Sequence, residues 1–532
     1  GDVYKRQGHA LYTARNYPRE YWNRTAFVAE PTGHLLATFE IQPDGANYRS
    51  RPSWNLLAGD DEWVAPIVGE VGPDGNVWVI DWYNYIVQHN PTPAGFTTGK
   101  GNAYEIPLRD KTHGRIYRLV SKEKPGDLKF TLKGASPEKL VATLRDPNLF
   151  WRRHAQRLLV DRGQKDVVPA LLDILATPKV DEIGLDVGAM HAIWTLHGLG
   201  AMGDSKVAQA VTSALRHSSA GVRRNAALAL PENVEAANAI IDAGLTADAD
   251  AQVRLAAFLA LADRPASPKA AAAVIKALAD PMIMADRWLP DAVTAAAARQ
   301  EGGFLSSWLA QPGEPDVASA KVASIVAEHV ARGNPAGRAD ELIQALASAK
   351  PARSAVVLKG FAKGWPEGKV ALSAASEKAL ETLLAQLPGE ARGDLFRLGD
   401  RWQVDTLLKQ TGKLLKELMA TVQDPKAPEA DRVSAASQAV DFGKKDSELA
   451  KKLISIITPQ SNPDLARGLL EAIGKSEAAV GKEIVDASTG WSPSIRGQAL
   501  RLLAQRPAWT PALLDASEKG TLRLTDLTLD QQ

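Results

Sequence analysis

One short pattern recurs along the chain and constrains its fold more than any other feature. In each copy, an apolar residue precedes an arginine. Alanine follows three positions after the arginine, and leucine follows four positions after the alanine. The four copies are Trp151–Leu159, Val222–Leu230, Val253–Leu261 and Ile495–Leu503. Looser copies place Ala192, Ala435 and Gly468 at the small-residue position, which recurs every 31 to 37 residues within each of two blocks. Such a period is typical of stacked helix pairs that approach closely. We therefore expect residues 137–532 to form a HEAT-like α-solenoid.

The arginines of this pattern have two possible roles. The four are Arg152, Arg223, Arg254 and Arg496. They could form a ladder of anion-binding groups on one face of the solenoid. However, Asp146 and Asp248 precede Arg152 and Arg254 by six residues, at the turn before each helix. Asp–Arg ties between neighbouring turns would stabilise stacking and cap helix ends, so we favour the structural role.

The first part of the chain has a different composition. All nine tyrosines lie at or before Tyr117, and aromatic residues with Gly/Pro turns favour strands. Turn signals occur at Pro31–His34, Pro43–Gly45 and Pro73–Gly75, where proline and glycine supply the dihedral angles of a hairpin. The 42 residues from Gly33 to Gly75 match a propeller blade of about 40–50 residues. A small open sheet is the alternative, although it would leave strand edges unpaired.

These features define the expected organisation, a β + α multidomain chain in which the C-terminal blades of a β-propeller precede the solenoid. Residues 1–7 are expected to be an artefact, and residues 8–120 a partial propeller of about two blades. Residues 121–136 are polar, contain Pro and Gly, and are expected to be a linker. We expect the chain to be a fragment of a longer protein.

Charge and cysteine content exclude several classes of protein. The 532 residues contain 63 Lys+Arg and 62 Asp+Glu, a net charge of +1, so no nucleic-acid partner is expected. Without any cysteine, disulfides, thiolate catalysis, zinc fingers and covalently attached haem are excluded from this chain. No run of eighteen apolar residues occurs, so we expect no membrane span.

One polar cluster is a candidate for chemistry. Asp81 and Asn84 end a predicted strand, and Arg109, His113 and Arg115 precede the next one. Loops at strand ends are where such scaffolds place binding residues. We assign His113 and Arg115 as catalytic candidates, because imidazole can act as a base and guanidinium can hold an oxyanion. Asp81, Asn84 and Arg109 are candidates for cofactor binding. The alternative is that Asp81 and Asn84 satisfy turn backbone while His113 and Arg115 pair within the sheet.

Other catalytic motifs are not found in the sequence. It has no G-x-S-x-G, no P-loop, no dinucleotide fingerprint and no H-E-x-x-H. The nine histidines show no spacing typical of metal ligands, so no metal site is predicted. We expect His154, His191 and His197 to have packing or surface roles.

Three strings resemble a known bacterial family. PREYWNRTAFVAEPTGHLL, DEWVAPIVGEVGPDGNVWVIDWYN and HGRIYRLV are similar to the end of the propeller in a family described as membrane-bound dehydrogenases. Its propeller is sorbosone/glucose-dehydrogenase-like and is followed by HEAT repeats, often with a C-terminal cytochrome c domain. The segment LRDPNLFWRRHAQRLL resembles the first helix of those repeats. The resemblance covers residues 9–265 well and the rest by repeat character.

The resemblance implies an exported, periplasmic or cell-surface protein that oxidises a sugar or alcohol. Its parent would use pyrroloquinoline quinone with calcium and pass electrons to a downstream c-type haem, with the solenoid as spacer or docking surface. The sequence departs from the family because it lacks the haem-binding motif CxxCH. The resemblance assigns no catalytic role to any residue of this sequence. We expect no quinone-dependent turnover from this chain alone. The alternative function is a non-catalytic scaffold that binds a protein or polysaccharide.

Overall fold

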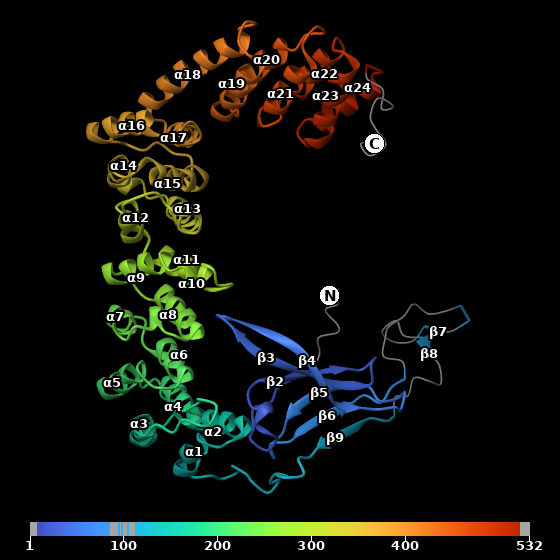
Figure 1. Cartoon of the computed structure of the whole chain (residues 1–532), viewed down its shortest axis with the longest axis vertical. Helices are drawn as coiled ribbons and strands as arrows, with labels where there is room; N and C mark the ends of the chain where they lie inside the picture. The colour runs from blue at the N-terminus through green and yellow to red at the C-terminus, as the bar shows by residue number, and fades with distance from the viewer. Residues whose placement is uncertain (1–7, 86–93, 96, 99–103, 106–111, 522–532) are drawn as a thin grey trace. The chain divides into compact units, whose positions relative to one another are not determined.

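The computed structural model describes residues 8–85, 94–95, 97–98, 104–105 and 112–521. The chain divides into two compact units, residues 1–304 and 305–532. The strands and the helices α1 to α11 belong to the first unit, and α13 to α24 belong to the second (Figure 1). Helix α12 (Glu301–Leu309) crosses the boundary. None of the helices in the described ranges has the length and apolar run needed to cross a bilayer.

The described strands form three small antiparallel sheets. They are β1 (His9–Leu11), β2 (Thr25–Glu30), β3 (Leu35–Asp44), β4 (Asn47–Ala58), β5 (Pro66–Val71), β6 (Val77–Asp81), β7 (Thr97–Thr98), β8 (Tyr104–Glu105) and β9 (Arg115–Leu119), with a 3-10 turn at Arg19–Tyr21. The first sheet is a meander in the order β1-β2-β3-β4, the second has the order β5-β6-β9, and the third pairs β7 with β8. We call the first two sheets and their loops (8–85 and 112–120) the β module.

The predicted turns lie between paired strands. Pro31–His34 joins β2 to β3, Gly45 and Ala46 close the β3–β4 hairpin, and Gly72–Asn76 joins β5 to β6. Gly45 has a φ of +61°, a conformation that favours glycine. The described strands contain no closed ring of blades, so the observed architecture is small sheets followed by a helical solenoid.

Two tyrosines hold the two sheets of the β module together. The Tyr12 ring is fully buried and stacks on Tyr17 with ring centroids 4.6 Å apart. The Tyr12 hydroxyl donates to the Gly75 carbonyl at 2.9 Å and accepts from the Tyr17 backbone N–H at 2.8 Å. Burial raises the pKa of Tyr12 to about 12. Both tyrosines therefore belong to the core of the β module.

Residues 121–136 contain no helix or strand but lie against the β module. The Pro125 carbonyl accepts from Asn76 Nδ2 at 2.7 Å and from Arg118 Nη2 at 2.9 Å. The Lys124 carbonyl accepts from Asn16 Nδ2 at 3.3 Å. This segment is therefore fixed to the sheets by its backbone.

Helices of the first unit stack in two rows, as the sequence period predicts. One row contains α2 (Leu149–Arg162), α4 (Val187–Gly198), α6 (Ala220–Ala229), α8 (Ala251–Asp263) and α11 (Leu289–Arg299). The other contains α1 (Pro137–Thr143), α3 (Val168–Ala176), α5 (Ser205–Ala214), α7 (Val234–Asp242) and α9 (Pro268–Leu278), and the short α10 (Pro281–Met284) follows α9. Ala155, Ala192, Ala226 and Ala257 are fully buried on successive helices of the first row. Each small side chain lets the next helix approach, which is the basis of the repeat.

The second unit continues with helices of the same kind. They are α13 (Val317–Arg332), α14 (Ala339–Ser348), α15 (Pro351–Gly364), α16 (Ala374–Gln386), α17 (Gly389–Trp402), α18 (Asp405–Gln423), α19 (Glu429–Phe442), α20 (Ser447–Ile456), α21 (Pro463–Ile473), α22 (Gly481–Ser488), α23 (Pro493–Gln505) and α24 (Thr510–Glu518). Gly468 on α21 takes the small-residue position, where a Cβ would lie 2.5 Å from Val433 Cγ2 on α19. Glycine is therefore required there by the close approach of two helices.

Buried arginines tie neighbouring repeats together through main-chain carbonyls. Arg264 is 2% exposed, and its guanidinium donates to the carbonyls of Pro231, Ala260, Ala227 and Leu230 at 2.6–3.0 Å. These acceptors include the last carbonyls of α6, which have no partner inside their own helix. One planar cation thus caps a helix end and joins it to α8.

The repeated arginines have the structural role that we favoured, with one difference in the acceptor. Arg152 and Arg254 donate to the carbonyls, not the carboxylates, of Asp146 and Asp248, both at 2.6 Å. The Asp248 carboxylate is instead bound by Arg223 of the preceding repeat, through two bonds of 2.8 Å. The sequence spacing located the turn correctly, but it could not distinguish the two kinds of oxygen.

Replacing Arg264 with methionine should destabilise the first unit. Arg264→Met leaves buried carbonyls without donors, and we expect a loss of about 2–4 kcal/mol of unfolding free energy. The matched control is Lys206→Met, because Lys206 is an exposed residue in the first turn of α5. Thermal unfolding followed by circular dichroism measures both variants. Equal melting temperatures for the two variants would contradict this role of Arg264.

Candidate functional site

The described residues of the predicted site lie where β6 ends and β9 begins. Asp81 is 1% exposed, and its Oδ1 accepts the backbone N–H groups of Ala65 at 2.7 Å and Tyr83 at 2.8 Å. Its Oδ2 accepts the Tyr117 hydroxyl at 2.9 Å. Both oxygens therefore hold the chain around the strand end, as the structural alternative for Asp81 requires. Asn84 is also buried, at 4% exposure.

Arg115 forms a small exposed cluster beside this strand end. Its guanidinium lies 3.5 Å from the centroid of the Tyr83 ring, and its Nη1 lies 3.5 Å from Asp61 Oδ2. Hydrogen bonds from the Trp63 backbone N–H and the Tyr83 hydroxyl, together with Arg115, hold the pKa of Asp61 below its usual value. An ionised carboxylate with a lowered pKa is a weak base, so this cluster favours ion pairing over proton transfer.

The two remaining predicted residues are His113 and Arg109. His113 is exposed, and its Nδ1 lies 3.1 Å from Thr112 Oγ1. Arg109 lies outside the described residues. Asp61 and Tyr117 were not identified from the sequence, although the acidic run at residues 60–62 marks a turn. Within the described ranges, no three His, Cys, Asp or Glu side chains are grouped to hold a metal ion.

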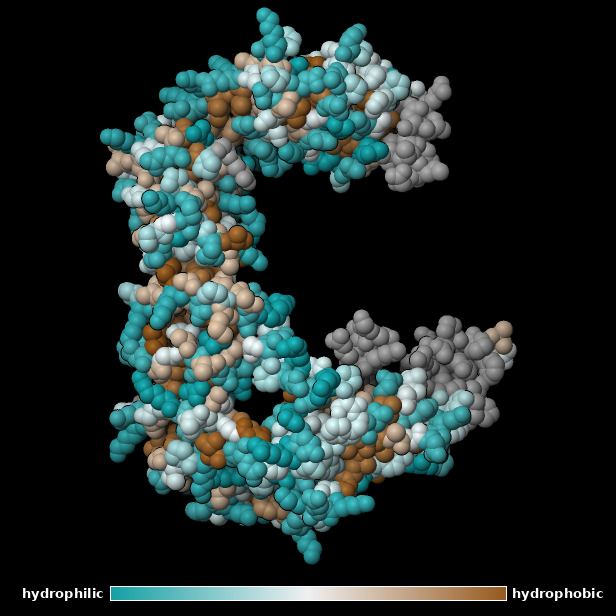
Figure 2. All heavy atoms as spheres, viewed as in Figure 1, coloured by the Kyte–Doolittle hydropathy of each residue, from teal (hydrophilic) through white to brown (hydrophobic). Residues whose placement is uncertain are grey.

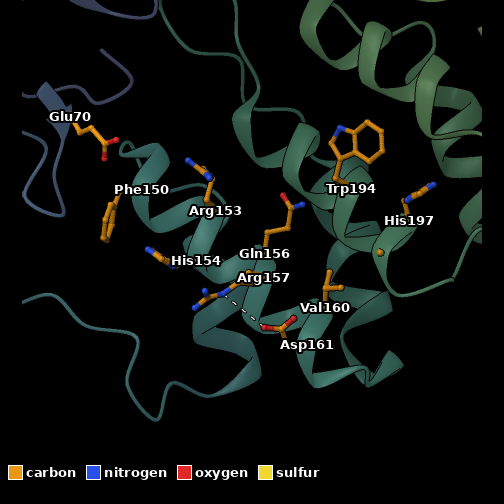
Figure 3. A pocket seen from close by; sticks show the side chains of 11 residues that line it. Glu70, Phe150, Arg153, His154, Gln156, Arg157, Val160, Asp161, Trp194 and His197 are labelled. Carbon is orange, nitrogen blue, oxygen red and sulfur yellow. Dashed lines mark ion pairs between the residues drawn. The ribbon is translucent and has the colours of Figure 1, made fainter. Parts of the chain in front are cut away.

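A polar and aromatic cleft lies between the β module and the first helices of the solenoid. It has a volume of about 650 Å³, and its lining includes Glu70, Phe150, Arg153, His154 and Trp194 (Figure 3). The His154 ring packs on Phe150 with centroids 4.5 Å apart, and burial lowers its pKa. The histidine is therefore neutral at neutral pH and has the packing role that we expected.

A larger groove separates the β3–β4 hairpin from the solenoid, and we call it the hairpin groove. Its volume is about 1280 Å³, and Figure 2 shows it as a hollow beside the β module. From the β module its lining includes Trp22, Arg24, Ile41, Gln42 and Tyr48. From the solenoid its lining includes Leu185, Arg224, Gln252 and Met282. Segments more than 200 residues apart in the sequence therefore share one concave surface.

The tip of the hairpin is held by the solenoid. The Ala46 backbone N–H donates to Asp286 Oδ2 at 2.7 Å, and the Ala46 carbonyl accepts from Gln252 Nε2 at 2.7 Å. Trp288 Nε1 lies 3.1 Å from Asn47 Oδ1. Ala46 is only 4% exposed, although it lies at the tip of a hairpin. We call these contacts the tip latch; Gly45 and Gln252, which lie beside or within it, also line the hairpin groove.

The opposite end of the β module is fixed by a second set of contacts. Asn148 Nδ2 donates to the Gly72 carbonyl at 2.8 Å, and Trp151 Nε1 donates to the Pro73 carbonyl at 2.7 Å. Arg15 forms an ion pair of 2.9 Å with Asp181 in the α3–α4 loop. The hairpin groove is thus framed by contacts at two separate places.

Comparison with known proteins gives little information about function. A family model described as a domain of unknown function (DUF7133) matches residues 4–123. None of the curated proteins matches the chain. The complex of CpcE and CpcF of phycocyanin lyase from Nostoc sp. PCC7120 is 18% identical, covers 49% of this chain and 100% of that chain, and gives a TM-score of 0.26. A homology model of the full-length AP-3 complex is 13% identical, with 75% and 88% coverage and a TM-score of 0.28. Likenesses this low carry no functional inference.

Removing the acid of the tip latch should loosen the hairpin tip. Asp286→Ala deletes the acceptor of the Ala46 N–H, so we expect the amides at the tip to exchange about tenfold faster or more. Hydrogen exchange with mass spectrometry on peptides covering residues 40–50 measures this change. Asp291→Ala, at an exposed position of α11, is the control. Unchanged exchange in Asp286→Ala would show that the latch does not hold the tip in solution.

One partly buried histidine should make the first unit sensitive to acid. His191 Nδ1 lies 2.7 Å from Gln156 Oε1, and burial lowers the pKa of His191 to about 3. Its ordinary pKa is about 6.5, so between these values only the unfolded chain binds the proton. Stability contributed by His191 is therefore complete above pH 6.5 and falls as the pH decreases toward 3.

The variant His191→Asn tests this linkage. An asparagine amide can still donate to Gln156 but does not titrate. Between pH 6.5 and 5, wild-type protein should lose about 2 kcal/mol more unfolding free energy than the variant. Thermal melts at both pH values measure the difference. Parallel pH profiles for the two proteins would exclude the proposed role of His191.

Proposed function

We propose that residues 8–304 act as a binding scaffold, and that the hairpin groove holds an extended polypeptide segment of a protein partner. The observation that carries this proposal is a concave surface of about 1280 Å³ framed by the β module, the solenoid and the tip latch. Binding sites commonly occur where two structural elements meet around a cleft. The contacts of Asp81 favour this function over catalysis at the strand end.

The edge of β3 offers only a few backbone groups to an occupant of the hairpin groove. Strand β2 begins opposite Glu40, so β3 continues from Ile41 to Asp44 without a strand partner on that side among the described residues. The Ile41 N–H already donates to the Arg24 carbonyl at 2.7 Å, and Pro43 has no N–H to donate. This edge therefore offers carbonyl acceptors but cannot add a full strand. A bound segment would be held largely by its side chains.

Both apolar and basic side chains line the hairpin groove, so it suits a polypeptide segment with apolar and acidic residues. Met282 is 74% exposed and Tyr48 is 49% exposed, so apolar surface is available from both walls. Arg224 has no ion-pair or hydrogen-bond partner among the described residues, whereas Arg24 lies 3.8 Å from Glu40. We therefore expect an apolar residue and a nearby acidic residue in the bound segment.

The dehydrogenase resemblance supports a second proposal for the parent protein. In this proposal, the meander β1-β2-β3-β4 is one blade of a β-propeller in a longer exported protein, because four antiparallel strands in sequence order make a blade. The described site residues do not fit calcium or a quinone. Both oxygens of Asp81 are already bonded to the protein, and no metal-binding group of side chains is found in the described ranges. We derive no redox step from them.

Peptide selection tests the binding proposal. A displayed library of extended peptides is selected against the full chain, and the affinity of the best binder is measured by fluorescence anisotropy. Met282→Glu places a charge in the apolar part of the hairpin groove and should weaken binding at least tenfold. Val317→Glu, at an apolar position that is 89% exposed on α13, is the matched control and should bind normally.

A chemical footprint gives an independent result. The chain has no cysteine, so Met282→Cys provides a single thiol for maleimide labelling. Bound peptide should slow this labelling, whereas Val317→Cys should label at an unchanged rate. Binders that tolerate both glutamate variants and leave the thiol of Met282→Cys accessible would contradict the proposed groove.

A further inference from the structure

A second, smaller cavity lies where the β module meets the first repeats of the solenoid. Its volume is about 200 Å³, enough for one small ion with ordered water, since water occupies about 30 Å³. The charged residues that line it are Arg15, Arg145, Arg152, Lys179 and Asp181. Four basic residues and one acidic residue therefore contribute to the lining of this cavity, which we call the junction cavity.

Arg152 is the most unusual group in the junction cavity. It is 3% exposed, and its Nη1 donates to the Asp146 carbonyl at 2.6 Å. Its Nε is buried and has no hydrogen-bond partner in the described part of the chain. Burial, and to a smaller extent the nearby Arg15, lowers the pKa of Arg152 to about 10, although Asp146 and Asp181 act in the opposite direction. A buried guanidinium with an unused donor is costly unless an acceptor occupies the adjacent space.

The other cations differ in how fully they are paired. Arg15 Nη2 lies 2.9 Å from Asp181 Oδ2. Arg145 Nη2 donates to the carbonyls of Ile174 and Thr177, and Nη1 lies 3.7 Å from Asp186. Lys179 is exposed; its backbone N–H donates to Asp186 Oδ2 at 2.7 Å, and its ammonium group makes no bond to any residue that the structure describes. Arg15 and Arg145 therefore each lie near a carboxylate, whereas the Lys179 ammonium and the Nε of Arg152 are left without a direct partner among the described residues.

The start of helix α4 adds to the positive potential of the junction cavity. Val187 and Gly188, the first residues of this 12-residue helix, line the cavity. The first turn of a helix carries backbone N–H groups and a partial positive charge, although Asp186 caps the Ala189 N–H here at 3.0 Å. A Cβ on Gly188 would lie 2.6 Å from Arg145 Cγ, so glycine allows the Arg145 side chain to cross the helix start.

We propose that the junction cavity binds a tetrahedral oxyanion, phosphate or sulfate, either free or as the end of a monoester. Guanidinium groups match such oxygens in geometry, and an ammonium adds a point charge. The anion would accept from Arg152 and Lys179 on the solenoid and lie beside Arg15 of the β module. Binding would therefore stabilise the attachment of the β module to the solenoid.

Calorimetric titration of the full chain tests this proposal. Sodium phosphate, sodium sulfate and methyl phosphate are each added at constant ionic strength, with chloride as the reference ion. Wild-type protein should bind phosphate or sulfate with one saturable site per chain, and its melting temperature should rise. Lys179→Gln should weaken binding about tenfold, because it removes one charged contact without changing a backbone bond. Lys276→Gln, at an exposed position of α9, should bind as wild type does.

A second variant tests anion binding independently of Lys179. Arg152→Lys retains the charge but removes the planar donor set, and it should weaken anion binding more than Lys179→Gln. Circular dichroism without anion verifies that both variants are folded. Methyl phosphate binding as tight as phosphate would support a site for an esterified ligand, whereas its rejection would support a free anion. No saturable binding to wild type, or equal binding by Lys179→Gln and Lys276→Gln, would overturn the proposal.

Discussion

Hydrogen bonds from arginine side chains to main-chain carbonyls at helix ends are the interaction on which the solenoid depends. Helix ends leave carbonyls without partners, and short helices in a repeat have many such ends. Arg264 donates to the carbonyls of Ala227 on α6 and Ala260 on α8, and Arg353 in the second unit donates to carbonyls of Trp308 and Gly313. Because each guanidinium contacts two neighbouring segments, the same bond caps a helix and fixes its distance from the next repeat.

That fixed spacing allows the β module to be held at two places. Trp151 near the first repeat donates to the β5–β6 turn, while Asp286, beyond α10, accepts from the hairpin tip. The β3–β4 hairpin must therefore reach along several repeats, and the hairpin groove is the space that remains beneath it. The junction cavity lies near the first of these attachments, where Arg15 meets the α3–α4 loop. Both proposed binding surfaces follow from how one module is attached to the other.

Local sequence patterns were enough to predict the repeating helices and turns, but not the contacts between the β module and the solenoid. Ala155 and Ala226 marked the helix stacking correctly, because a close approach requires a small residue at a fixed period. The Pro/Gly turns marked the hairpins for a similarly local reason. The bond between Ala46 and Asp286 joins residues 240 positions apart, and no local pattern encodes it. Likewise, an arginine spacing cannot show whether its partner is a carboxylate or a carbonyl, nor that Asp81 is buried against backbone N–H groups.

The attachments at two places should make the β module and the solenoid of residues 137–304 one cooperative unit. Native-state hydrogen exchange in increasing urea measures this, because each amide reports the free energy of the opening that exposes it. We predict that the slowest amides of β2, β3 and β6 and those of α2, α4, α6 and α8 converge on one opening free energy and one urea dependence. Strand amides that exchange through a separate opening of lower free energy, while the helices stay protected, would contradict the account.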